Sequence, residues 1–187
     1  PGVRRRAQEA FANEEVDVVV ATVAFGMGID RTDVRFVLHA ALPKGLEQYS
    51  QETGRAGRDG LPAECVLFHS GADFFSWKSL IERSHEEARA AGESPDPAAL
   101  QGAIERLGEM RNYAARMVCR HRQLVEHIGQ TWEGGPSCAA CDVCLSEIEP
   151  APDSTVLAQK ILSGVVRCEQ RFGAAHVADV LRGAETQ

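Results

Sequence analysis

Short apolar runs alternate with amphipathic stretches over the first third of the chain. Residues 18–22 and 63–68 are rich in apolar and β-branched side chains, and residues 34–40 alternate before they become apolar. Runs of this kind predict strands. Residues 4–11 place alanine and phenylalanine on one helical face, and a short helix is expected between the last two strands. Strands that alternate with helices are typical of a parallel sheet, so the pattern predicts an α/β lobe.

The rest of the chain shows helical periodicity. Apolar residues recur at helical spacing over residues 73–91 and, as one or two helices, over residues 98–128. A linker rich in proline and charge at residues 147–153 marks a domain boundary, and two short amphipathic helices follow it. We therefore expect three parts, with boundaries at residues 1–71, 72–149 and 150–187.

Four cysteines lie close together after the long helices. Cys138, Cys141 and Cys144 form a double Cys-x-x-Cys, and Cys119 precedes them by eighteen intervening residues. Four thiolates at such spacings suit a tetrahedral zinc ion, with Zn–S bonds of ~2.3 Å. Disulfides are disfavoured because no secretory signal is recognisable, whereas an iron–sulfur cluster remains compatible with the spacing.

Other candidate ligands and charges surround this motif. Cys65 falls in a predicted strand and Cys168 on a predicted helix, so both are expected to be small core residues. His121 and His127 have suitable chemistry for a metal, but four thiols already complete a tetrahedron. Basic residues gather around Cys119, namely Arg111, Arg116, Arg120, His121 and Arg122. They either contact phosphates or form a solvated helix surface balanced by nearby glutamates, and the pattern slightly favours the second.

The densest run of glycine and arginine is QETGRAGRDG at residues 51–60, called the arginine segment below. An arginine in a glycine-rich turn can place its planar guanidinium against a phosphate. Arg55 and Arg58 therefore have the chemistry of an arginine finger, which stabilises charge on a transferred γ-phosphate. By itself, such a short motif is equally compatible with a basic surface turn.

A loop with two glycines, residues 23–30, follows the first predicted strand. In open α/β sheets, ligands bind beyond the carboxyl ends of the strands. The loop is therefore placed to meet a nucleotide or a nucleic-acid backbone. Taken alone, the segment favours an ordinary buried strand with a glycine turn.

The sequences ATVAFGMGID and QETGRAGRDG, in that order, resemble the last two helicase motifs of RecQ-type ATP-dependent DNA helicases. The resemblance implies that residues 1–71 are the C-terminal part of a second RecA-like lobe. It further implies a helical zinc-binding module over residues 72–149 and the start of a winged helix over residues 150–187. The implied site residues are Arg58 and Arg55 at the γ-phosphate, Asp30, Gln51 and Gly28 at ATP, Thr22 at the DNA backbone, and Cys119, Cys138, Cys141 and Cys144 at a structural Zn²⁺.

The same resemblance implies 3′-to-5′ DNA unwinding in replication, recombination and repair, with ATP and Mg²⁺ as cofactors of the intact enzyme. The implied partners are DNA junctions and a missing first lobe in cis, and the implied location is the bacterial cytoplasm and nucleoid, with a nuclear location left open. The chain departs from the family because it contains neither G-x-x-x-x-G-K-[ST] nor the acidic Mg²⁺ motif. We therefore expect this chain alone to be inactive and its winged helix to be truncated.

Composition changes this picture in two respects. The net charge of −7 is wrong for a protein that coats nucleic acid non-specifically, so DNA contacts must come from local basic patches or from parts outside this sequence. No run of eighteen apolar residues occurs, so no membrane-spanning segment is expected. Two alternatives to a helicase part remain, a non-catalytic zinc-stabilised DNA- or protein-binding module and a purely structural adaptor.

Overall fold

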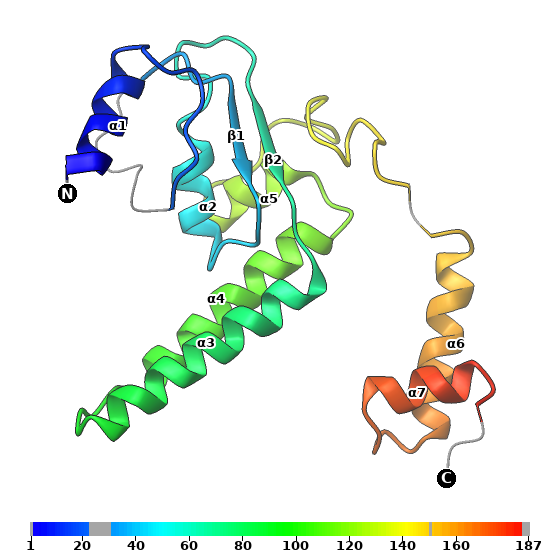
Figure 1. Ribbon diagram of the computed structural model, residues 1–187. Coiled ribbons are helices and arrows are strands. Elements are labelled where there is room, and N and C mark those ends of the chain that lie inside the picture. The colour runs from blue at the N-terminus through cyan, green and yellow to red at the C-terminus, as the bar shows by residue number, and fades with distance from the viewer. Residues whose placement is uncertain (1, 23–30, 150, 185–187) are drawn as a thin grey trace. The chain divides into compact units, whose positions relative to one another are not determined.

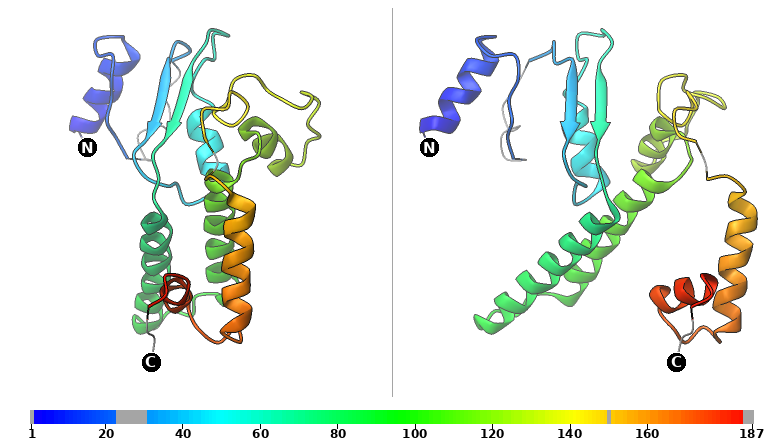
Figure 2. Two further views of the ribbon diagram at one scale, coloured as in Figure 1. Left: turned by 90° about the vertical axis from the view of Figure 1, so that its right-hand side faces the viewer. Right: turned by 45° about the vertical axis from the view of Figure 1, so that its right-hand side comes forward.

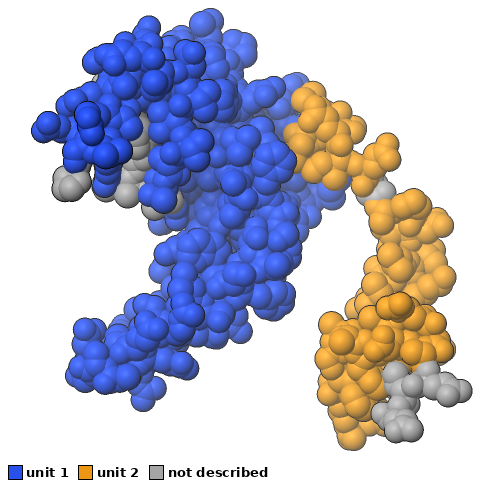
Figure 3. All heavy atoms as spheres, viewed as in Figure 1, with its two compact units in different colours: residues 1–141 blue, residues 142–187 orange. Residues whose placement is uncertain are grey.

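A computed structural model describes residues 2–22, 31–149 and 151–184 of the chain (Figure 1). The chain divides into two compact units, residues 1–141 and 142–187, which Figure 3 distinguishes by colour. Each unit is described by itself. The division into three parts expected from the sequence stays a prediction.

A parallel sheet forms the α/β portion of the first unit. Strand β1 (Phe36–His39) pairs with β2 (Glu64–Leu67), with Phe36 opposite Glu64 and His39 opposite Leu67. The connection between the strands contains helix α2 (Leu46–Thr53). Two parallel strands joined through a helix confirm the predicted α/β class.

Helix α1 (Gly2–Ala12) confirms the helix predicted over residues 4–11, but the strand predicted over residues 18–22 is wrong. Those residues join no sheet in the described ranges, and Val18 and Val20 are exposed. β-Branched residues favour a strand only when a neighbouring strand can pair with their backbone groups and cover one face. That partner is not among the described residues.

Two long helices form a hairpin that runs away from the sheet, as Figures 1 and 2 show. Helix α3 (Gly71–Ala90) starts with a capping box between Ser70 and Asp73. Helix α4 (Pro97–Ala115) starts with the Asp96 side chain accepting from the Ala98 N–H. Helix α5 (Arg120–His127) follows, so the region predicted as one or two helices contains two.

The core of the first unit lies where α2 meets this hairpin. Its buried side chains come from α2, the residues just before it and α4: Leu42, Leu46, Tyr49, Leu107, Met110 and Tyr113. Trp77 of α3 packs against them, and its indole N–H donates to the Leu42 carbonyl at 2.7 Å. Burial of these apolar surfaces therefore holds α2 on the helical hairpin.

The second unit contains two helices that pack on each other, α6 (Ser154–Arg167) and α7 (Ala174–Leu181). Gly164 of α6 permits the close approach, because a Cβ there would lie 3.1 Å from Leu181 Cδ2. Val177 of α7 is buried. The two-helix pattern predicted after the linker is confirmed. Among the described residues of both units, no helix combines the length and apolar content that crossing a bilayer requires.

Candidate metal centre and arginine segment

The four cysteines predicted as metal ligands converge. The Sγ atoms of Cys119, Cys138, Cys141 and Cys144 all lie within 4.8 Å of one another. Tetrahedral Zn–S bonds of ~2.3 Å place sulfurs about 3.8 Å apart, so small shifts close the four thiols on one ion. The donor set therefore fits a structural zinc ion, which has four protein ligands and no open position.

Backbone N–H groups donate to two of the four sulfurs. Cys119 is the N-cap of α5, and its sulfur accepts from the Arg122 N–H at 3.5 Å. The Cys141 sulfur accepts from the Arg120 N–H at 3.4 Å. Hydrogen bonds of this kind to ligand atoms orient the ligands of a metal site.

The pKa of the Cys138 thiol is raised above its ordinary value. Removal from solvent is the largest cause that raises the pKa of Cys138 to about 11; backbone N–H groups of Ala140 and Cys141 lower it, and hydrogen bonding of the protonated Cys138 with the Cys141 and Cys119 sulfurs raises it. Zinc binds thiolate, so binding here must release a proton.

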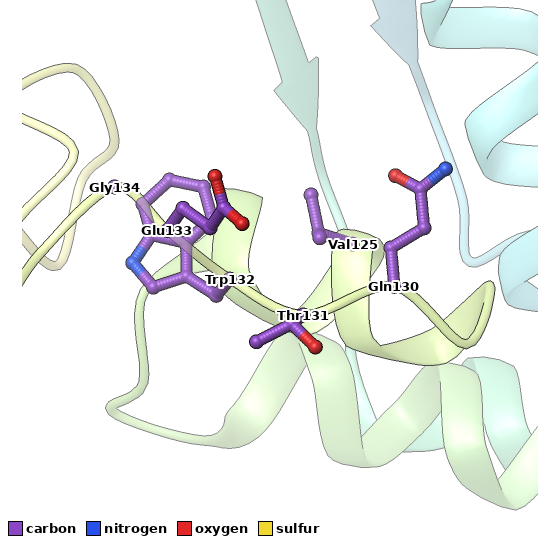
Figure 4. A pocket seen from close by; sticks show the side chains of 6 residues that line it. All are labelled: Val125, Gln130, Thr131, Trp132, Glu133 and Gly134. Carbon is purple, nitrogen blue, oxygen red and sulfur yellow. The ribbon is translucent and has the colours of Figure 1, made fainter.

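The loop that leads into the cysteine-rich segment is built on Trp132 (Figure 4). Its indole N–H donates to the Gly135 carbonyl at 2.7 Å. The ring fills the space of a side chain at Gly134, because a Cβ there would lie 2.1 Å from ring atom Cζ2. An open hollow adjoins the loop and is lined by Val125, Gln130, Thr131, Trp132, Glu133 and Gly134. The pattern of the sequence did not single out Trp132, whose ring contacts depend on the folded loop.

Most of the arginines around Cys119 contact other groups of the same chain. The Arg120 guanidinium donates to the Arg116 and Tyr113 carbonyls. Arg122 pairs with Glu126 at 2.8 Å, and Arg111 lies 4.3 Å from the centroid of the Phe74 ring. These contacts favour a helix surface over a phosphate site. Among the described residues, the metal-ligand cluster contains the four thiols without His121 or His127.

The two remaining cysteines, Cys65 and Cys168, are not in the metal-ligand cluster of the described residues, and only Cys65 departs from its expected place in the core. Cys65 is exposed, so its prediction as a core residue is wrong. Cys65 is the second residue of β2, and its thiol lies 3.8 Å from the carbonyl of Thr53, the last residue of α2. The end of the helix does not cover this part of the strand, so Glu64 and Cys65 are both exposed. Cys168, at the C-cap of α6, is half-buried.

Residues 51–53 of the arginine segment are the end of α2, and residues 54–59 form consecutive turns directly after it. Two backbone bonds tie it to the residues that enter β1, from Gly57 N–H to the Val34 carbonyl at 3.0 Å and from Asp59 N–H to the Thr32 carbonyl at 3.2 Å. Because these residues precede both strands, the segment lies at the amino ends of β1 and β2. Hydrogen bonds to a distant segment of the chain therefore fix the conformation of this turn, which local sequence alone would not fix.

Side chains reinforce the turn. The Arg35 guanidinium donates to the Asp59 carboxylate at 2.5 Å, to the Pro62 carbonyl at 3.1 Å and to the Asp33 carbonyl at 2.8 Å. The hydrogen bond from Arg35 is the largest of the causes that lower the pKa of Asp59. Gly57 has φ +65°, which a residue with a Cβ adopts only with strain.

The structure describes four of the six residues that were predicted to contact nucleotide or DNA. Arg55 is half-buried, whereas Gln51 and Arg58 are exposed, and the Arg58 Nε donates to the Gly54 carbonyl at 3.1 Å. Thr22 is exposed. Gly28 and Asp30 lie outside the described residues. Gln51 thus lies in the last turn of α2 and Arg55 and Arg58 in the turns that follow it, and the roles of all six residues stay predictions.

Comparison with protein families assigns three successive regions. Residues 1–60 match the helicase conserved C-terminal domain, residues 71–145 the RecQ zinc-binding domain and residues 151–187 the RQC domain.

Individual relatives span all three regions. The chain is 40% identical over 185 residues to an ATP-dependent DNA helicase RecQ of Bacillus subtilis, and the match covers 99% of this chain and 29% of that protein. It is 43% identical to a protein of the same name from Haemophilus influenzae (99% of this chain, 28% of the relative). It is 42% identical to another from Pasteurella multocida (98% and 27%). The chain thus spans less than a third of the length of these curated relatives. With a four-cysteine cluster inside the matched zinc-binding region, the chain belongs to the RecQ-type helicase family and corresponds to its helicase C-terminal, zinc-binding and RQC regions.

Proposed function

We propose that the chain is the C-terminal part of the core of an ATP-dependent 3′-to-5′ DNA helicase that unwinds DNA in replication, recombination and repair. The observation that carries the proposal is the order of two sites along the chain. Residues 54–60, which we call the arginine turn, are held by two backbone hydrogen bonds within a region that matches the helicase C-terminal domain, and a zinc-binding region with four clustered thiols follows them. The relatives bear the name ATP-dependent DNA helicase RecQ. The polarity of unwinding rests on the family resemblance.

In this proposal ATP and Mg²⁺ bind between this region and a first lobe in cis. Arg58 contacts the γ-phosphate and Arg55 lies beside it, while Asp30, Gln51 and Gly28 form the edge of the nucleotide site. A guanidinium at this point stabilises the negative charge of the transferred phosphoryl group. Thr22 contacts the DNA backbone as the cleft opens and closes.

The geometry of the turn supports this role. Donors that are held in place before the reaction stabilise developing charge without first reorganising. The two backbone bonds to Val34 and Thr32 provide such a fixed base. Arg35 also neutralises Asp59, so the carboxylate next to Arg58 does not repel the phosphates of the nucleotide.

Zinc has a structural role in this proposal. When bound, it supplies four bonds that join the start of α5 to the cysteine-rich loop. The chain lacks G-x-x-x-x-G-K-[ST], so it should hydrolyse no ATP by itself. We place the intact protein in the bacterial cytoplasm, on DNA.

The decisive test is Arg58→Ala in the protein that also contains the phosphate-binding lobe. Loss of an arginine finger lowers turnover by roughly 10³–10⁵. We expect a loss of that order in DNA-stimulated ATP hydrolysis, with DNA affinity unchanged. Arg83→Ala is the matched control, because Arg83 is exposed on α3 and pairs with Glu87 one turn away. Turnover of Arg58→Ala equal to that of the control would remove Arg58 from this role.

A non-catalytic zinc-stabilised binding module is the alternative, favoured by the missing phosphate-binding motif within this sequence. The same assay separates the two functions. A protein that binds DNA but hydrolyses no ATP, even when intact, supports the binding module and contradicts the helicase.

A further inference from the structure

Two buried tyrosines join the helix before the arginine segment to the zinc-binding region. Tyr49 of α2 and Tyr113 of α4 have ring centroids 5.4 Å apart at an interplanar angle of 54°. Each is only 5% exposed. Tilted aromatic pairs at this separation attract each other beyond the burial of their surfaces. This contact therefore fixes the position of α2 on α4.

The same face of α2 also contacts the sheet, because Tyr49 and Glu52 lie three residues apart on the helix. His39, the last residue of β1, lies 2.6 Å from the Glu52 carboxylate through its Nε2 and 5.1 Å from the Tyr49 ring between centroids. The second Glu52 oxygen accepts from the Gln48 amide at 3.0 Å. Helix α2 is therefore held by contacts with a strand and with a helix of the zinc-binding region.

The arginine segment continues α2 without an intervening loop. The Arg55 N–H donates to the Glu52 carbonyl at 3.4 Å, and the Ala56 N–H donates to the Thr53 carbonyl at 3.0 Å. A displacement of α2 on α4 therefore carries the base of the arginine turn with it.

We propose that Tyr113 is a positioning residue for the arginine segment: acting through Tyr49, it sets the location of α2 and hence of Arg55 and Arg58. The proposal rests on the proposed function as far as turnover is concerned. It assigns a part in ATP hydrolysis to a residue of the zinc-binding region that need not touch nucleotide, DNA or metal. Tyr113 is also close to the metal centre, because its carbonyl accepts from Arg120, whose own N–H donates to Cys141 Sγ.

The first experiment uses this chain and does not depend on ATP hydrolysis. Hydrogen exchange is followed at residues 46–60 in the wild type, Tyr113→Leu and Tyr113→Phe. Leucine keeps an apolar side chain but removes the ring contact, and phenylalanine keeps the ring. The control is Leu100→Ala, a loss of apolar packing on the same helix beyond the residues that contact α2. We expect Tyr113→Leu to accelerate exchange at residues 46–60 at least tenfold more than Leu100→Ala does, and Tyr113→Phe to stay close to the wild type.

The second experiment measures ATP hydrolysis in the protein that contains the first lobe. A displacement of about 1 Å at a reacting group can lower turnover roughly 100-fold. We expect Tyr113→Leu to lower kcat by about 10- to 100-fold with KM for ATP within about twofold of the wild type, and Tyr113→Phe to restore kcat. If the substitutions only destabilised the fold, the fraction of active molecules would fall in both Tyr113→Leu and Leu100→Ala.

The outcomes separate this inference from the proposed function. Equal exchange at residues 46–60 in Tyr113→Leu and Leu100→Ala overturns the positioning role, and so does an unchanged kcat in an active protein. A wild-type protein that hydrolyses no ATP overturns the proposed function, and with it the claim about turnover, whatever the exchange shows. If Tyr113→Leu fails to fold, Tyr113→Phe provides the test. A kcat far below that of the wild type, with hydrogen exchange at residues 46–60 unchanged, would contradict the ring contact as the cause of positioning.

Discussion

Replacing Gly57 by alanine should destabilise the first unit, whereas the same replacement at Gly108 should not. Gly57 has φ +65°, and a Cβ there would lie 3.0 Å from the Leu61 carbonyl oxygen and 3.3 Å from Ala63 Cβ. The left-handed conformation costs a residue with a Cβ about 1–2 kcal/mol. The contact with a backbone oxygen adds to this, because neither neighbour is the free end of a flexible side chain.

Gly108 is the matched control. It lies within α4, has no positive φ, and a Cβ there meets no atom within 4 Å. Alanine in the middle of a helix is more stable than glycine by roughly 0.5–1 kcal/mol, so Gly108→Ala should stabilise the unit.

The assay is urea unfolding followed by circular dichroism at 25 °C. The two variants should move the unfolding midpoint in opposite directions and differ by about 2 kcal/mol in free energy of unfolding, the sum of the two contributions. A Gly57→Ala variant as stable as wild type would refute the reasoning. It would mean that the arginine turn has other conformations of equal energy and is not fixed by its bonds to the residues before β1.

Three further predictions concern the metal, the buried pair and acid. Chelation or Cys141→Ser should unfold the zinc-binding region, and native protein should contain one zinc per chain by elemental analysis and show no visible absorption; a chromophore would indicate an iron–sulfur cluster instead. Glu52→Gln should lower the free energy of unfolding by about 1–3 kcal/mol because it weakens a part-buried contact with His39, whereas Glu82→Gln, at an exposed pair, should change it by less than about 0.5 kcal/mol. Hydrogen bonds from the backbone and side chain of Ser70 lower the pKa of Asp73 below its ordinary 3.8. A lowered carboxyl pKa stabilises the fold above pH 3.8, and this stability is lost as the pH falls through the lower folded pKa. Asp73→Asn should therefore reduce the loss of stability in acid titrations followed by circular dichroism.

Local patterns in the sequence predicted most of the secondary structure. The helices carry their own signals, such as the Ser70–Asp73 capping box and Asp96 followed by proline. The cysteine motif likewise predicted its own metal centre, because ligand chemistry and short spacing leave few alternatives. The strand over residues 18–22 failed for the converse reason: a strand exists only with a partner, and residue type does not supply one.

What the sequence by itself determined is therefore the set of helices, the parallel pairing of two strands, the four thiol ligands and the two arginines with phosphate-binding chemistry. Only the tertiary structure decided how the arginine turn is held. Its bonds run to Val34, Thr32 and Arg35, and its helix is fixed by the contacts of Tyr49 with Tyr113 and of Glu52 with His39. These partners are separated by up to 64 positions in the sequence. Helical periodicity, capping and cysteine spacing are properties of neighbouring residues, whereas contacts between distant segments exist only after the chain has folded and appear in no local pattern.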